Sequence, residues 1–193
     1  MAKLLLSSCD FRNAESAKSI YENLPFPIQD CRVLYFPNEK ATEADIISEK
    51  FYNRLSHFGF NRQNIHVFNY YSPADFDINS KIDVIYISGG NTFGTLKRIR
   101  ESDADKIIMH YVSKGAVYVG GSAGAHIASR SIAHVSKYDV DTYGLTDFSG
   151  LHLFDGLLIC HYTDARKDDY LKLIEQGKRN VVMLRDQDCL VIE

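Results

Sequence analysis

One serine lies between two glycines in the stretch Ala116–Arg130, which reads AVYVGGSAGAHIASR. Gly120, Ser122 and Gly124 have the G-x-S-x-G spacing of a nucleophile elbow. Apolar residues before this motif predict a buried strand, and small residues after it predict a helix, so we expect Ser122 at a tight strand-to-helix turn. Free N–H groups at the start of the helix could then stabilise an oxyanion. The alternative is a serine that only caps the helix.

A serine nucleophile needs a general base. Among the seven histidines, His161 ends an apolar strand and precedes a loop, which is where a parallel sheet presents its functional groups. His134 and His152 lie in an irregular segment and stay open as bases. His126 should point away from Ser122 along the elbow helix. The other three are expected to be structural: His57, His66 and His110.

An acid must orient the base, and four aspartates follow the elbow in suitable loops. Asp139 and Asp141 lie in the loop after the elbow helix. Asp186 and Asp188 lie in the turn between the two last strands. The spacing alone does not choose among them.

A second glycine-rich turn, Gly89–Gly90, follows the apolar run Ile82–Ser88. If the strands before the two turns are neighbours, an N–H group of this turn and the N–H of Ala123 would form a two-donor oxyanion hole. The alternative is a turn whose glycines only allow positive φ.

Strands alternate with helices along the chain, which predicts an α/β fold, a three-layer α/β/α sandwich with a largely parallel sheet. The predicted strands are Lys3–Leu6, Cys31–Phe36, Ile65–Tyr70, Ile82–Ser88, Ala116–Val119, Leu157–His161, Val181–Leu184 and Cys189–Ile192. The predicted helices are a short one before Pro25, a long one over Thr42–Phe58, and Phe93–Arg100, Ala104–Lys114 and Asp164–Gln176.

Composition narrows the class of protein. The 193 residues carry a net charge of −3 and no basic run, which argues against nucleic acid as a partner. No apolar stretch approaches the length of a membrane helix, and the N-terminus reads as a strand rather than a signal peptide. The four cysteines are scattered, without the spacing of zinc ligands, which favours a reduced, cytoplasmic protein that uses no metal.

Three motifs occur in a specific order along nearly the whole chain. They are GGNTF within Ile87–Lys97, Y-x-G-x-SAGA over Tyr118–Ala125, and a strand followed by H-Y-T over Ile159–Thr163. This pattern resembles the peptidase E family of serine peptidases. The resemblance implies a flavodoxin-like fold and a single domain over residues 1–193. It also implies that the fold continues beyond the last strand, so that this chain is truncated at its carboxyl end.

The resemblance also implies roles for individual residues. Ser122 would be the nucleophile and His161 the general base, while Gly90 and Ala123 would donate to the oxyanion. Asn91, in the same turn as Gly90, is assigned to substrate binding.

For the acid, the family's aspartate after the elbow helix aligns with Lys137 without a gap, and a two-residue shift brings Asp139 there. A family acid before a late strand corresponds to Asp186, which we rank slightly above Asp139. Arg166 corresponds to the arginine that binds the aspartyl side chain in peptidase E.

The sequence therefore predicts a cofactor-free serine peptidase that cleaves short peptides, including Asp-X dipeptides, through an acyl-enzyme on Ser122. The expected partner is a small peptide, and a homodimer stays open. Two alternatives remain. One is a serine hydrolase of another ester or amide bond. The other is an inactive flavodoxin-like binding module.

Overall fold

The computed structural model describes residues 2–193. Its strands are β1 (Leu4–Ser7), β2 (Val33–Phe36), β3 (Ile65–Val67), β4 (Val84–Ile87), β5 (Val117–Gly121), β6 (Leu157–Ile159), β7 (Val181–Met183) and β8 (Cys189–Ile192). Its α-helices are α1 (Ala14–Asn23), α2 (Glu43–Ile47), α3 (Lys50–His57), α4 (Thr92–Glu101), α5 (Ala104–Ser113), α6 (Ala123–Ala128) and α7 (Lys167–Glu175).

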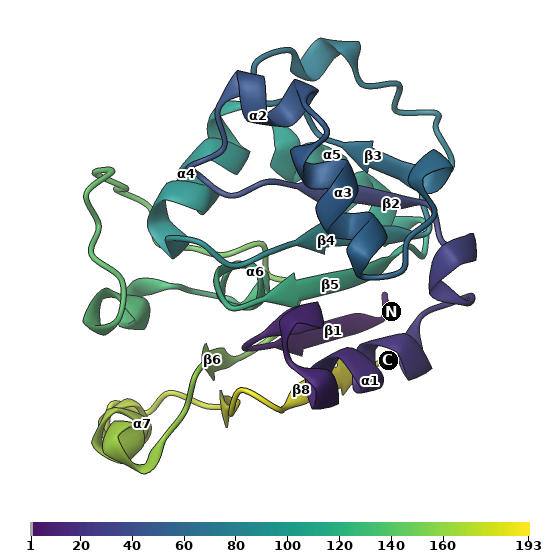
Figure 1. Ribbon diagram of the computed structural model, residues 1–193. Coiled ribbons are helices and arrows are strands. Elements are labelled where there is room, and N and C mark those ends of the chain that lie inside the picture. Colours follow the sequence, from purple (N-terminus) through teal and green to yellow (C-terminus); the bar gives the residue numbers. More distant parts are fainter. Residues whose placement is uncertain (1) are drawn as a thin grey trace.

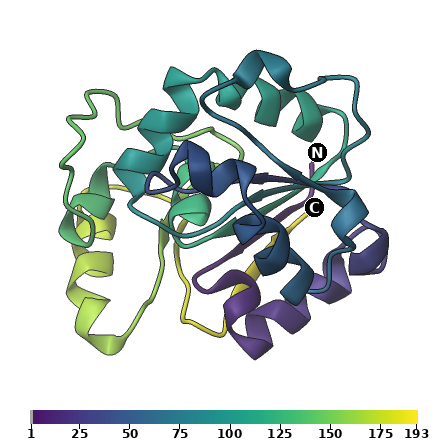
Figure 2. The same ribbon diagram turned by 45° about the horizontal axis from the view of Figure 1, so that its top comes forward.

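The main sheet has six strands in the order β3-β2-β4-β5-β1-β8, all parallel except the edge strand β8. Helices cover both faces: α1 and α3 lie in front of the sheet in Figure 1, and α5 lies behind it (Figures 1 and 2). Because both faces are covered, β1, β2, β4 and β5 are buried along their whole length. This confirms the predicted three-layer α/β sandwich. No helix of residues 2–193 is both long and apolar enough to cross a membrane.

The strand order places two glycine-rich turns side by side. β4 pairs with β5 in a register that sets Ile87 opposite Gly120. β1 pairs with the other edge of β5 and sets Ser7 opposite Gly121. The segments after β1, β4 and β5 therefore meet at one end of the sheet, with the serine turn in the middle.

A small second sheet pairs β6 with β7 in parallel. Beyond these strands, the two chain segments continue side by side, because Leu184 N–H donates to the Ile159 carbonyl and Tyr162 N–H donates to the Leu184 carbonyl. The hydroxyl of Ser8, just after β1, also donates to the Leu184 carbonyl at 2.9 Å. This contact ties the small sheet to the end of β1, next to the serine turn.

The long helix predicted over Thr42–Phe58 is wrong: the structure has two helices, α2 and α3, separated at Ser48. Ser48 has extended backbone angles. Its hydroxyl donates to the Asp45 carbonyl and accepts from the Lys50 N–H, at 2.8 and 3.2 Å. A serine that bonds to nearby backbone in this way competes with the helical pattern. Apolar periodicity alone could not reveal this break.

Candidate active site

Ser122 joins β5 to α6 in a strained backbone conformation, with φ 49° and ψ −105°. Its N–H donates to the Ser7 carbonyl at 2.8 Å, so the neighbouring strand holds the turn. The side chain makes no capping hydrogen bond to α6. Instead, Oγ lies 3.0 Å from Nε2 of His161. The alternative of a serine that only caps the helix is therefore wrong.

The elbow requires its two flanking glycines because strand and helix touch there. A Cβ at Gly120 would lie 2.7 Å from the Gly124 carbonyl oxygen. A Cβ at Gly124 would collide with the backbone of Ile87 in β4. Any side chain at either position would push α6 away from the sheet and displace Ser122.

His161 lies two residues beyond the end of β6, so the predicted strand over Leu157–His161 is too long. It also has a positive φ, 53°. Its N–H donates to Ser8 Oγ at 2.9 Å, which fixes this conformation. Nε2 faces Ser122, and Nδ1 lies 2.6 Å from Oδ1 of Asp186. The hydrogen bond from His161 holds the pKa of Asp186 below its ordinary value.

Asp186 lies on an exposed turn after β7, and its side chain is 58% exposed. A cavity of about 190 Å³ opens beside it and His161. Its remaining lining residues are Tyr162, Thr163, Arg185 and Gln187. His161 and Asp186 are thus reached from solvent at this cavity, whose lining does not include Ser122.

The other aspartates lie elsewhere in hydrogen-bonded turns. Asp139 Oδ2 accepts from both the N–H and the hydroxyl of Thr92, at 2.8 and 2.6 Å, at the start of α4. Asp141 accepts from backbone N–H groups of its own loop, and Asp188 from the Arg185 N–H. The structure therefore corrects the placement of Asp139: its carboxylate supports α4 and does not bond to His161.

The turn before α4 lies against the elbow, as an oxyanion hole requires. A Cβ at Gly89 would lie 3.3 Å from the Cβ of Ser122. Among residues 2–193, the N–H of Gly90 has no hydrogen-bond partner. Asn38 Nδ2 donates to the Gly89 carbonyl at 3.0 Å, and Glu39 Oε2 accepts from the N–H of Asn91 at 3.0 Å.

Asn38 and Glu39 therefore position this turn, although the sequence analysis did not select them. The available signal was their location just after a predicted parallel strand, Cys31–Phe36. The Asn91 side chain caps α4 by accepting from the Gly94 N–H, and it donates to the Val140 carbonyl. Its assignment to substrate binding stays a prediction.

Two further arginines border the site besides Arg185. Arg166 donates to the Cys160 carbonyl, and its guanidinium lies 4.1 Å from the centre of the Tyr138 ring. Arg12 follows β1, and its Nε donates to Oδ1 of the fully buried Asp10 at 2.9 Å.

The Arg12 guanidinium reaches across to the turn next to the nucleophile. A Cβ at Gly89 would lie 3.0 Å from Arg12 Nη2 as well as 3.3 Å from the Cβ of Ser122. Arg12 was not predicted from the sequence, because only the sheet order places the end of β1 beside β5.

The other histidines have structural surroundings. His126 is buried, and burial lowers its pKa to about 3. Its Nε2 accepts from the Cys160 N–H at 3.4 Å, so it supports the segment that carries His161. His134 Nε2 donates to the Leu158 carbonyl at 2.7 Å. His152 lines a cavity with Leu4, at the far end of β1 from Ser7.

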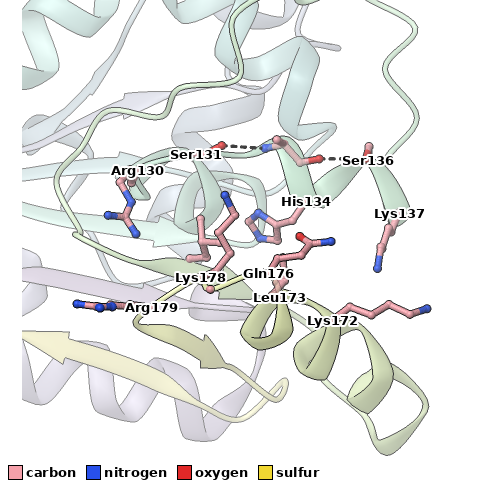
Figure 3. A pocket seen from close by; sticks show the side chains of 13 residues that line it. Arg130, Ser131, His134, Ser136, Lys137, Lys172, Leu173, Gln176, Lys178 and Arg179 are labelled. Atoms are coloured by element: carbon pink, nitrogen blue, oxygen red, sulfur yellow. Dashed lines mark hydrogen bonds between the residues drawn. The ribbon is translucent and has the colours of Figure 1, made fainter.

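Another cavity, of about 590 Å³, lies between the segment after α6 and the end of α7, and His134 is one of its lining residues (Figure 3). Its lining is rich in basic side chains but includes neither Ser122 nor His161. Two of the cations are paired outside it: Arg130 with Asp155 at 3.1 Å and Lys137 with Asp169 at 2.7 Å. Another, Lys172, lies in the last turn of α7, where a cation is favoured by the helix dipole.

Comparison with known proteins assigns the chain to a family. The model of peptidase family S51 matches residues 3–193. The chain belongs to this peptidase family.

Curated relatives include an uncharacterized peptidase of Listeria monocytogenes, 32% identical over 58% of this chain and 57% of its own length. Peptidase E of Haemophilus influenzae is 30% identical over 84% of this chain and 74% of its own length. The match to the Listeria monocytogenes peptidase thus spans little more than half of that relative's length.

Two solved structures share the fold. A crystal structure of a candidate peptidase E from Listeria monocytogenes matches all of this chain and 94% of its own, with a TM-score of 0.71 at 23% identity. A peptidase from an acI-B1 actinobacterium matches all of this chain and 84% of its own, with a TM-score of 0.64 at 16% identity.

Proposed function

We propose that this chain is a serine peptidase that hydrolyses short peptides through an acyl-enzyme on Ser122. The observation that carries the proposal is the unbroken chain of contacts from Ser122 Oγ to His161 Nε2 and from His161 Nδ1 to Asp186, at 3.0 and 2.6 Å. Nucleophile, base and orienting acid in this geometry are the constellation that catalyses acyl transfer.

In the first half of the reaction, His161 Nε2 takes the proton of Ser122 Oγ as this oxygen attacks the substrate carbonyl. Asp186 accepts the Nδ1 proton in a hydrogen bond, which keeps Nε2 unprotonated and then stabilises the imidazolium. The imidazolium gives its proton to the leaving amine. In the second half, His161 activates a water molecule in the same way, and the acid product and free Ser122 are released.

The oxyanion forms between the two glycine-rich turns. The N–H groups of Gly90 and Ala123 are the proposed donors, one from the turn before α4 and one from the first turn of α6. Asn38 and Glu39 hold the first turn in place before any substrate binds. Donors that are already oriented contribute roughly 3–4 kcal/mol each to the stabilisation of an oxyanion.

The substrates we propose are short peptides, with Asp-X dipeptides among them. Membership of peptidase family S51 supports a peptide as the substrate. Cationic side chains that could receive an aspartyl carboxylate stand on two sides, Arg166 near Cys160 and Arg12 near Gly89. Of the two, Arg12 has its guanidinium next to the nucleophile.

The test is a hydrolysis panel of Asp-X, Asn-X and uncharged dipeptides together with small esters, with Ser122→Ala as the matched control. We expect dipeptide turnover in the unmodified chain and none in Ser122→Ala. Turnover of esters alone would favour the alternative acyl hydrolase. No turnover of any substrate would favour the inactive binding module, an alternative that the hydrogen bonds joining Ser122, His161 and Asp186 do not support.

A further inference from the structure

Three side chains with different donor atoms converge at the outer end of the candidate triad. The thiol of Cys9, one ring nitrogen of His161 and a carboxylate oxygen of Asp186 all lie within 4.8 Å of one another. Cys9 lies two residues beyond the end of β1, while the other two follow β6 and β7. Sequence spacing could not show this cluster because its members are far apart along the chain.

We propose that Cys9, His161 and Asp186 form an inhibitory zinc site that switches the candidate serine nucleophile off. Sulfur, imidazole nitrogen and carboxylate oxygen are the three ligand types that zinc takes in proteins. The proposal rests on the proposed function for its inhibitory effect, but binding of the metal does not depend on any activity.

The geometry needs only a small change to hold the ion. Zinc binds such ligands at about 2.0–2.3 Å, which sets neighbouring ligand atoms about 3.5 Å apart in a tetrahedron. Nδ1 of His161 lies 2.6 Å from Asp186 Oδ1 and must separate slightly from it. The Asp186 side chain is 58% exposed on a turn, so it can move outward, and solvent can supply the fourth ligand.

The charges around the cluster are compatible with a divalent cation. Three arginines lie nearby, and each already has a partner. Arg12 pairs with the buried Asp10 at 2.9 Å, Arg185 pairs with Asp164 at 3.5 Å, and Arg166 donates to the Cys160 carbonyl. Asp186 adds a negative charge at the site itself. When zinc binds, the thiol of Cys9 releases its proton and becomes a thiolate ligand.

Metal at Nδ1 would block catalysis through the tautomer of His161. In the resting site, Nδ1 carries the proton that Asp186 accepts, and Nε2 has the lone pair that faces Ser122 Oγ. With zinc on Nδ1, the neutral ring must carry its proton on Nε2. Nε2 can then only donate to Ser122 Oγ, so it cannot take the proton that the nucleophile must lose. Zinc therefore inhibits without touching the substrate.

The first experiment measures metal binding without any reference to activity. We expect Co²⁺ added to the whole chain to give a thiolate-to-metal charge-transfer absorption that Zn²⁺ displaces. The band should persist in Ser122→Ala and disappear in Cys9→Ser. Cys189→Ser is the matched control, since Cys189 is also partly buried but lies outside the cluster. A band that persists in Cys9→Ser, or no band at all, would overturn the site.

The second experiment measures labelling of Ser122 by a fluorophosphonate during a zinc titration. We expect zinc to suppress labelling and a chelator to restore it. Loss of an outer-sphere partner of a metal ligand weakens metal binding about 10- to 100-fold. Cys9→Ser removes a direct ligand, so it should weaken inhibition by zinc at least as much. Cys189→Ser should leave inhibition by zinc unchanged. A cobalt band together with labelling that zinc leaves unchanged would overturn the inhibitory role. If the chain is not labelled even without metal, the proposed function fails, while the cobalt spectrum still decides the site.

Discussion

Ser122 and His161 both have positive φ angles, 49° and 53°, and their side chains meet at 3.0 Å. Non-glycine residues rarely adopt such angles, which cost about 1–3 kcal/mol each. Here both are held by neighbours at the end of β1: the Ser7 carbonyl accepts from Ser122 N–H, and the hydroxyl of Ser8, the next residue, accepts from His161 N–H. One short strand end thus positions the nucleophile and its base together.

Because the backbone at Ser122 is strained, glycine at this position should stabilise the fold relative to alanine, which is the reverse of its effect in a helix. Ser122→Gly relieves the backbone strain, whereas Ser122→Ala keeps it. We therefore expect the glycine variant to be more stable than the alanine variant by about 1 kcal/mol in urea unfolding. Ser19, within α1, is the matched control. At this position, Ser19→Ala should be more stable than Ser19→Gly by about 1 kcal/mol. The same order at both positions would argue against strain at the elbow.

Substitution of Asp186 should lower the reactivity of Ser122, whereas substitution of Asp139 should lower the stability of the fold. Asp186→Asn removes the acceptor that orients His161, so we expect fluorophosphonate labelling of Ser122 to slow by about 10²-fold or more. Asp139→Ala removes two hydrogen bonds from Thr92, so it should cost about 1–2 kcal/mol of stability and leave labelling near normal. Labelling rates and unfolding curves of both variants test this pair. The reverse pattern would transfer the orienting role to Asp139.

Burial of His126 predicts a loss of stability in acid. Its pKa is about 3 in the folded chain, below the ordinary value of a histidine. The unfolded chain therefore takes up a proton first as the pH falls. His126 contributes stability fully above its ordinary pKa and loses it below, at up to about 1.4 kcal/mol per pH unit.

His126→Gln should flatten this slope between about pH 6.5 and pH 4, because glutamine does not titrate. Burial also lowers the pKa of His134, whose ring centre lies 6.0 Å from that of His126, so His134→Gln is measured in parallel to separate the two contributions. Urea unfolding at several pH values measures the two slopes. Parallel slopes would show that His126 is not the group that titrates.

The two arginines should affect Asp-X preference differently. Arg12→Gln removes the cation next to Ser122, so we expect kcat/KM for Asp-X to fall about 10- to 100-fold, as for loss of a hydrogen bond to a charged group. Turnover of Asn-X should change little. Both guanidinium groups are already engaged, Arg12 with Asp10 and Arg166 with the Cys160 carbonyl, so position decides. We expect the smaller effect from Arg166→Gln, because Arg12 is the one placed against the Gly89 turn. A larger effect of Arg166→Gln would support the role that the family resemblance implies for it.

The sequence predicted those features that depend on local pattern. Apolar runs identified the strands, and the motif around Ser122 identified the elbow, because a strand-to-helix contact this close requires glycine on both sides. His161 was found because it follows a strand. The loop carrying Asp139 could equally have reached His161, but it folds back on Thr92 instead, and only tertiary structure decides this. The order of the strands is equally invisible locally, so Cys9 and Arg12 were missed.

The central claim is that Ser122 is a nucleophile activated by His161. Intact-mass spectrometry after brief exposure to a fluorophosphonate, followed by peptide mapping, tests it most directly. We predict a single adduct on Ser122, absent in Ser122→Ala and strongly slowed in His161→Gln. An adduct that persists in Ser122→Ala, or that forms on Ser122 at the same rate without His161, would contradict the account.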